Sequence, residues 1–342
     1  MAFRVLVAGG AGLVGSAVAK QLLSEGAEVV AVDSFGEQGD GRAVREERAA
    51  ALRAFPKATV VTADLTLPGA AGEVFRDLRP AAVVNAAVFP PGGPGVVAML
   101  EAIRGHEKPF LVHLSDAALY GAPGAPGQPA HEDEPADPGR DPVLLQRMVE
   151  EARLRGSDVP NVILRLFDVL APGAPANRFP QDALEALLDG DEVVLPSDAP
   201  RDLLHVRDAV HAILAALALR PAGRTINVGS GRGVAPSRLV RLLAERAFRP
   251  VRIRTAGDAP RPPRVADLSR AGELLRFQSR TSLETAAGEI VAARLGTPET
   301  STSRPRPIAP APRGPEREEQ KEVSRRGLFG FFRRPFDGGR RS

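Results

Sequence analysis

Residues 9–16 read GGAGLVGS, and this stretch decides the fold. It follows the apolar run FRVLVA (3–8) and leads into LVGSAVAKQLLSEG (13–26), which has helical spacing and ends at a glycine. Its glycines fit two overlapping spacings, Gly10-x-Gly12-x-x-Gly15 and Gly9-x-x-Gly12-x-x-Gly15. Glycine lets such a turn tighten and lets the backbone approach a pyrophosphate, which the first amides of the helix then hold. The stretch therefore predicts a strand, a phosphate-binding turn and a helix.

The rest of the first 170 residues repeats this alternation of strand and helix. Apolar runs that are nearly continuous are typical of strands in a parallel sheet covered by helices on both faces. Such runs occupy 3–8, 28–33, 58–64, 81–87, 109–115 and 161–167. The pattern predicts an α/β fold with a doubly wound parallel sheet, the Rossmann architecture, over residues 1–170.

The remaining sequence divides into three parts. Helical and strand patterns continue over 171–295, but they look too few and too scattered for a core of their own. We expect a smaller substrate lobe, interleaved with the first domain, that closes over the carboxyl edge of the sheet. Residues 296–323 are rich in Pro, Arg, Glu and Ser, which predicts a disordered linker. Residues 324–342 form a basic aromatic tail motif.

The composition excludes several classes of protein. The chain has no cysteine, so it can build neither a disulfide framework nor a thiolate metal site. The opening MAFRVLVAGG is too short an apolar run for a signal peptide, and no run approaches the roughly 20 residues of a membrane span. We therefore expect a cytoplasmic protein.

The positive charge is concentrated at the carboxyl end. The chain has net charge +3, but 324–342 holds six Arg and one Asp, a net +5, so the remainder carries −2. The body is therefore not expected to bind nucleic acid. The tail, SRRGLFGFFRRPFDGGRRS, also holds four of the 14 phenylalanines. It fits an anchor on an anionic membrane surface, a peptide that docks in a partner's groove, or a tail without a partner.

Two acidic residues extend the predicted cofactor site. Asp33 ends the second strand, 21 residues after Gly12, where a carboxylate accepts hydrogen bonds from an adenosine ribose. Because a carboxylate there disfavours a 2′-phosphate, NAD is favoured over NADP. Asp64 ends the third strand and could border the adenine. The alternative is a glycine turn that only packs a helix and binds nothing.

Three later motifs, read with the glycine turn, give the chain a family resemblance. They are RDLLHVRDAVHA (201–212), INVGSGRGV (226–234) and ADLSRAGELL (266–275). Together they resemble the extended short-chain dehydrogenase/reductases, and within them the NAD-dependent sugar-nucleotide epimerases and dehydratases. VDSFGEQGDGRAVREERAAAL (32–52) also looks like the matching segment of uronate-sugar epimerases.

The resemblance implies NAD in the large domain and a nucleotide sugar beneath the small one. It adds further positions to the expected cofactor site: Leu13, Val14, Leu65, Ala86 and Arg147. It also implies a possible homodimer formed through the helices after the fourth and fifth strands.

The positions that carry the family's catalysis are all substituted. The family uses a Ser or Thr at the end of the fifth strand and a Tyr-x-x-x-Lys pair on the next helix. Here Asp116 stands at the Ser/Thr position, Val143 at the tyrosine and Arg147 at the lysine. Val143 has no titratable group, whereas Arg147 stays protonated and could still contact the nicotinamide ribose. The single tyrosine, Tyr120, matches a different family position.

The substrate region is altered as well. The family usually has a longer substrate-contacting segment after the fourth strand, but AVFPPGGPGVVAMLEA (87–102) passes almost directly from strand to helix. Arg201 and Arg254 stand where the family places arginines that reach the diphosphate, and the guanidinium fork suits phosphate oxygens.

Other polar residues offer weaker candidates. His113, His131, Asp116 and Asp141 could form an improvised acid/base set. However, His113 lies in an apolar strand, and His131 lies in the acidic stretch HEDEP (131–135), so structural and solvated roles are the alternatives. For His205, beside the Arg201 motif, we expect a structural role.

These observations leave three hypotheses. The cofactor motif beside the substituted catalytic positions favours an NAD-binding protein that is catalytically degenerate and acts as a binding, sensing or scaffold module. It would join a complex or a membrane through its tail. The alternative is an active nucleotide-sugar epimerase, dehydratase or reductase that uses Asp116, His113 or a substrate group in place of the tyrosine. The third is a scaffold with an empty cofactor site.

Overall fold

A computed structural model describes residues 3–36, 40–67, 69–104, 108–121, 127–175, 177–257 and 264–296. Its centre is a seven-stranded sheet in the order β10-β6-β5-β4-β1-β2-β3, and every neighbouring pair is parallel. The strands are β1 (Arg4–Ala8), β2 (Glu28–Asp33), β3 (Ala58–Thr62), β4 (Ala82–Asn85), β5 (Phe110–Asp116), β6 (Asn161–Leu166) and β10 (Arg224–Val228). The predicted doubly wound α/β sheet is confirmed.

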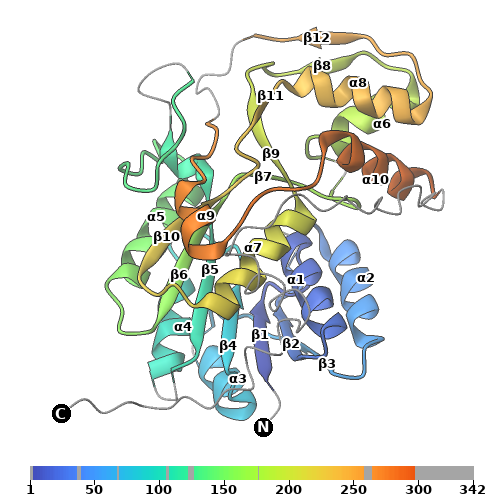
Figure 1. The fold of residues 1–342 in the computed structure, drawn as a ribbon. Helices are drawn as coiled ribbons and strands as arrows, with labels where there is room; N and C mark the ends of the chain where they lie inside the picture. The colour runs from blue at the N-terminus through green and yellow to red at the C-terminus, as the bar shows by residue number, and fades with distance from the viewer. Residues whose placement is uncertain are drawn as a thin grey trace, which may run out of the picture.

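Helices cover both faces of this sheet (Figure 1). One face packs against α1 (Leu13–Ser24), α2 (Arg42–Arg53), α7 (Val206–Leu219) and α9 (Ser269–Leu275). The other packs against α3 (Ala70–Leu78), α4 (Gly95–Arg104) and α5 (Pro142–Arg155). Because both faces of the sheet are covered, β1, β4 and β5 are buried along nearly their whole length, which explains why their apolar residues do not simply alternate with polar ones.

The sheet gains a strand from the segment assigned to the substrate lobe. β10 pairs with β6 at the sheet edge, and α7 packs against α1 on the main core. Apolar periodicity predicts that these elements exist, but it cannot say which core they join, because that choice depends on contacts between segments far apart in the chain.

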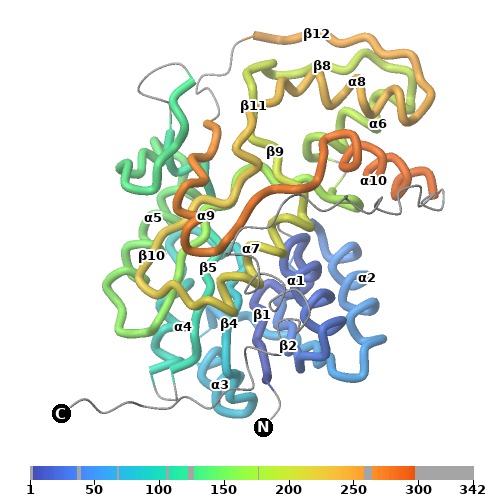
Figure 2. Tube along the Cα trace, viewed as in Figure 1, coloured from blue at the N-terminus to red at the C-terminus, as the bar shows by residue number. Residues whose placement is uncertain are grey.

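The rest of that segment forms a lobe above the carboxyl ends of the strands, at the top of Figure 1 and along the trace in Figure 2. Together with β7 (Asp168–Leu170), which comes just before that segment, the lobe contains α6 (Gln181–Asp189), β8 (Val193–Leu195), β9 (Arg201–His205), β11 (Gly233–Val234), α8 (Pro236–Ala247), β12 (Ile253–Thr255) and α10 (Leu283–Leu295). These elements bury a hydrophobic cluster separate from the sheet. The expectation that they lack a core was therefore wrong, because apolar side chains from α6, α8, α10 and β8 pack against one another.

The predicted linker, apart from Gly296, and the tail motif 324–342 lie outside the described residues. Within the described residues, no helix is both long enough and apolar enough to cross a membrane.

Candidate functional site

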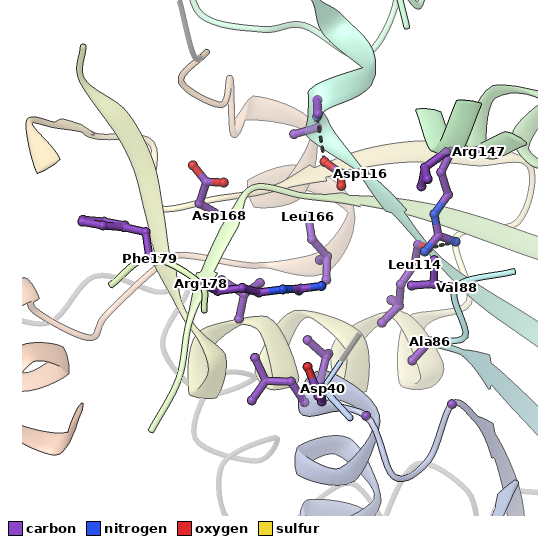
Figure 3. A pocket seen from close by; sticks show the side chains of 18 of the residues that line it. Asp40, Ala86, Val88, Leu114, Asp116, Arg147, Leu166, Asp168, Arg178 and Phe179 are labelled. Carbon is purple, nitrogen blue, oxygen red and sulfur yellow. Dashed lines mark hydrogen bonds between the residues drawn. The ribbon is translucent and has the colours of Figure 1, made fainter. Parts of the chain in front are cut away.

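A cavity of about 1550 Å³ lies between the sheet and the lobe (Figure 3). The chain moves from β1 out to β3 and then returns to β4 on the other side of β1, so the strand order reverses between β1 and β4. In open α/β sheets, ligands bind at the carboxyl ends of the strands at such a reversal. A pocket for one ligand typically measures roughly 300–1,000 Å³, so this cavity has room for two.

The glycine turn forms one wall of the cavity. Gly9 has φ +69°, and a Cβ built there would lie 2.8 Å from the backbone of Ala86 at the end of β4. A Cβ on Gly15 would lie 2.1 Å from the Gly9 carbonyl oxygen, whereas one on Gly12 would meet only that oxygen, at 3.1 Å. Gly9 and Gly15 are thus required for packing, while Gly12 keeps space open toward the cavity. The start of α1, including Leu13 and Val14, lines the same wall, so the geometry fits a pyrophosphate.

Asp33 holds the turn in place. Its Oδ2 accepts a hydrogen bond from the Ala11 amide at 3.0 Å, and its Oδ1 accepts one from the Phe35 amide at 3.0 Å. The Oδ1 atom also accepts a bond from Arg45 Nη1 at 3.1 Å. Arg45 lines the cavity and was not singled out from the sequence, because an exposed-helix pattern gives no sign of which arginine faces a cofactor.

The predicted adenine border also lines the cavity. Asp64 accepts hydrogen bonds through Oδ1 from the amide and hydroxyl of Thr66, at 2.9 and 2.6 Å, and thereby fixes the loop after β3. Leu65 is buried beside it, and both residues line the cavity together with Ala86.

Asp116 ends β5 and opens into the cavity (Figure 3). Its Oδ1 accepts a bond from the Ala118 amide at 2.8 Å, which leaves Oδ2 for other partners. The Asp116 carboxyl is open to the cavity, yet protein atoms surround it on its other sides. This partial removal from water raises the pKa of Asp116. The Asp168 and Asp141 carboxylates raise the pKa further. The Ala118 amide and the Arg147 cation act in the opposite direction.

Helix α5 carries Val143 and Arg147, the residues that the resemblance aligns with the family's tyrosine and lysine. Asp141 caps the helix through bonds from the amides of Val143 and Leu144, at 2.8 and 3.2 Å, so it serves the helix terminus. Val143 lines the cavity with 41% of its surface exposed. Arg147 also lines the cavity, but its Nη1 donates to the carbonyl oxygens of Ala87 and Leu114 at 3.2 and 3.4 Å.

His113 is fully buried within β5 and does not line the cavity. The Asn85 Oδ1 atom accepts from the Ala87 amide, so Asn85 Nδ2 is the donor to His113 Nδ1 at 2.9 Å. Burial lowers the pKa of His113 to about 3, and the Arg147 cation contributes in the same direction. A neutral, enclosed imidazole matches the structural alternative for this residue.

A buried polar network lies behind Asp116. Ser115 Oγ donates to Glu151 Oε1 at 2.7 Å, and Arg165 donates to both carboxylate oxygens of Glu151, at 2.9 and 2.7 Å. The Arg165 guanidinium stacks 4.6 Å from the Tyr120 ring centre, and burial raises the pKa of Tyr120 to about 12. Tyr120 donates its hydroxyl to Asn227 Oδ1 at 2.6 Å, so it is a poor substitute for a catalytic tyrosine.

The two predicted phosphate arginines lie in different places. Arg201 lines the cavity, pairs with Asp168 at 2.7 Å and lies over the ring of Phe179. Arg254, in contrast, is not among the cavity-lining residues: it pairs with Glu192 at 2.9 Å, with 57% of its side chain exposed. The role of Arg254 in substrate binding stays a prediction, since its side chain contacts Glu192.

Two further arginines line the cavity, and sequence reasoning did not single them out. Arg178 extends below Asp168 and Leu166 in Figure 3. Arg264 is buried and bonds both oxygens of Glu134 at 3.0 Å. Both lie in segments without regular secondary structure, where periodicity carries no signal.

Neither of the two other candidate histidines, His205 and His131, is among the residues that line the cavity. His205 caps α7 by accepting from the Arg207 amide at 3.2 Å, and its Nε2 lies 3.1 Å from Glu289. His131 is exposed, 3.6 Å from Asp133. Across the part of the chain that the structure describes, no group of His, Cys, Asp or Glu has an arrangement that could hold a metal ion.

Residues 5–229 match the model of the NAD dependent epimerase/dehydratase family. The chain belongs to the NAD-dependent epimerase/dehydratase family. This assignment confirms the resemblance drawn from the motifs, and it covers the glycine turn, Asp116 and α5.

Two relatives align with this chain over nearly the whole of their own length. A dTDP-6-deoxy-L-talose 4-dehydrogenase (NAD(P)(+)) from Kitasatospora kifunensis is 29% identical, over 86% of this chain and 96% of the relative. A UDP-glucose 4-epimerase from Mycolicibacterium smegmatis is 30% identical, over 82% of this chain and 95% of the relative.

Solved structures share the fold at lower identity. UDP-glucuronic acid 4-epimerase from Bacillus cereus, in complex with UDP-glucuronic acid and NAD, has a TM-score of 0.76 at 20% identity, covering 85% of this chain and 99% of the other. dTDP-glucose 4,6-dehydratase from Bacillus anthracis, in complex with NAD, has a TM-score of 0.78 at 19% identity, covering 86% and 97%.

Proposed function

We propose that this member of the family binds NAD and a nucleoside-diphosphate sugar, and that it interconverts the sugar with Asp116 as the proton-transfer group. The observation that carries the proposal is the position of Asp116 in one cavity with the glycine turn and Arg201. The relatives named above are enzymes, which supports the active alternative over a degenerate protein.

The cavity supplies complementary ends for the two ligands. Gly9 and Gly12 leave room for a pyrophosphate at the start of α1, and Asp33 lies within reach of an adenosine ribose. Bound NAD would supply the hydride acceptor and donor. On the lobe side, Arg201 and Arg178 offer cationic forks that suit a diphosphate. Both cited structural neighbours contain NAD, and one contains a UDP-sugar as well.

Asp116 suits proton transfer for three reasons. Its Oδ2 has no amide partner, it faces the cavity, and its pKa is raised by burial. A carboxyl with a raised pKa exchanges protons more readily near neutral pH than an ordinary aspartate does. As the sugar carbon is oxidised, Asp116 takes the hydroxyl proton, and it returns that proton when the carbonyl is reduced.

A comparison of two variants on a panel of UDP- and dTDP-sugars tests this role. We expect Asp116→Asn to lower turnover by about 10²–10⁴-fold, the usual contribution of a positioned acid/base group, with the NAD affinity unchanged. The matched control, Val143→Ala, removes apolar atoms from the same cavity and should change turnover by less than about threefold. Full activity of Asp116→Asn, measured by product chromatography, would refute the assignment.

A second function is favoured by α5. Val143, which the resemblance aligns with the tyrosine, presents an apolar surface to the cavity, and backbone carbonyls engage Arg147. A protein of this kind would bind NAD and a nucleotide sugar as a sensor or scaffold without converting either one. Bound NAD together with no turnover across the whole panel would favour this function over the first.

We also propose that the protein is cytoplasmic and that 324–342 joins it to a protein partner or to an anionic membrane surface. The support is the tail's six arginines and four phenylalanines. A homodimer is proposed from family resemblance alone, and native mass spectrometry of the purified chain would give the subunit count together with any bound dinucleotide.

A further inference from the structure

The carboxylate of Asp33 is almost fully engaged by the protein itself. A carboxylate offers about four lone-pair sites over its two oxygens. At Asp33, Oδ1 accepts from the Phe35 amide and from Arg45, and Oδ2 accepts from the Ala11 amide. About one site, on Oδ2, is left for a ribose hydroxyl. The carboxylate therefore cannot hold both hydroxyls of the adenosine ribose while Arg45 remains bound.

The charge of Asp33 is also balanced locally. Arg45 Nη1 lies 3.1 Å from Oδ1, with 17% of the Arg45 side chain and 3% of the Asp33 side chain exposed. At this low exposure, water screens the pair far less than a surface ion pair. An aspartate normally rejects a 2′-phosphate through the repulsion between two anions, and a guanidinium beside it removes most of that repulsion.

Arg45 is held on the cavity wall by the start of α2. The helix begins after Gly41, whose φ of +72° turns the chain, and Arg45 lies in the first turns. Arg48, one turn later, is held by Asp40, by the Ala11 carbonyl at 3.4 Å and by the Gly173 carbonyl at 3.0 Å. Arg48 does not line the cavity, so Arg45 is the guanidinium of α2 that faces the ribose position.

We propose that Arg45 sets the choice of dinucleotide, allowing this protein to bind NADP nearly as well as NAD. A guanidinium is a planar and permanent cation, so it attracts a phosphate that lies beside the carboxylate. The inference deepens the proposed function and rests on it, because it takes the cavity to be a dinucleotide site.

Calorimetric titration with NAD and with NADP tests the proposal on the wild-type chain and on Arg45→Ala. We expect the two wild-type dissociation constants to differ by less than about tenfold. In Arg45→Ala, the ratio of NAD affinity to NADP affinity should rise by about tenfold or more, because only NADP loses a charge-assisted contact, while the Oδ1 site that Arg45 leaves can accept a ribose hydroxyl. Arg42→Ala is the control, since Arg42 precedes Arg45 on α2 and pairs with Glu46 outside the cavity.

Two further measurements separate a binding effect from a folding defect. Arg45→Gln keeps the first three side-chain carbons and a polar end without the charge, and it should reproduce the loss of NADP affinity relative to NAD, with a thermal melt close to that of Arg42→Ala. For the wild type, added salt should weaken NADP more than NAD, because the extra contact is between two ions.

The outcomes are distinct. If NAD binds and the ratio of the two affinities is the same in wild type, Arg45→Ala and Arg45→Gln, the role of Arg45 is overturned and the proposed function stands. A wild-type chain that binds NADP more than about 100-fold more weakly than NAD overturns it too. If neither dinucleotide binds, both the proposed function and the role of Arg45 are refuted.

Discussion

At the scale of single residues, environment separates groups that look alike in the sequence. Asp116 and Asp141 were both candidates for an acid/base set, but Asp116 opens into the cavity whereas Asp141 caps α5. His113 and Asp116 are three residues apart on β5, yet one is enclosed and the other faces the cavity. The functional assignment therefore depends on which way each side chain points.

His113 gives a prediction about acid stability. The folded protein holds this imidazole neutral down to about pH 3, whereas in the unfolded chain it takes up a proton below its ordinary pKa of 6.5. Since the unfolded state binds more protons between these values, stability is fully present above pH 6.5 and is lost as the pH falls. The loss should approach about 1.4 kcal/mol per pH unit below pH 6.

Wild type is compared with His113→Gln, because the glutamine amide oxygen can still accept a hydrogen bond from Asn85. Urea unfolding of both proteins from pH 7 to pH 4.5 should show that the gap in stability between them narrows as the pH falls. A gap independent of pH would contradict a buried neutral His113, and groups common to both proteins cancel in the difference.

At the scale of elements, the turn from β1 into α1 combines packing and binding in one short stretch. A Cβ on Gly15 would overlap the Gly9 carbonyl oxygen, so no side chain fits there. A Cβ on Gly12 would contact only that same oxygen, so space remains beside Gly12. The same motif therefore contains a residue needed for the fold and a residue needed for the ligand.

This division predicts opposite behaviour for two glycine variants. Gly15→Ala should lower the free energy of unfolding by about 1–3 kcal/mol or more, because its methyl group overlaps the backbone of the turn. Gly12→Val should cost less stability, yet weaken NAD binding by about 100-fold or more, because its side chain fills the path of the pyrophosphate.

Chemical denaturation and calorimetric titration measure the two effects separately. Gly72→Ala on α3, where a Cβ would meet nothing within 4 Å, is the control and should be neutral or slightly stabilising. The assignment fails if Gly15→Ala is as stable as this control, or if Gly12→Val binds NAD normally.

At the scale of the whole molecule, the segment 171–295 contributes to two cores. β10 and α7 complete the sheet, while α6, α8 and α10 form the lobe that faces it across the cavity. The site thus has one wall from each core, and its residues come from distant parts of the chain.

The tail gives a prediction at this scale. With six arginines and four phenylalanines, the full chain should sediment with phosphatidylserine-containing vesicles several-fold more than a chain ending at Gly296. Binding should fall as salt rises, because each arginine near an anionic surface contributes about 1 kcal/mol of screened attraction. Equal sedimentation of the two chains would exclude the membrane surface and leave docking to a protein partner.

The sequence by itself determined six strands of the sheet and the cofactor turn, and it predicts that the family's catalytic pair is substituted. These features are local: strands and turns follow from apolar runs and glycine spacing, and a missing tyrosine is missing in any fold. Only the tertiary structure decided that β10 belongs to the sheet, that Arg254 pairs with Glu192 and that Arg45 lies against Asp33. These are contacts between residues far apart in the chain or on neighbouring elements, where side-chain direction and burial, and not residue type, decide which groups meet.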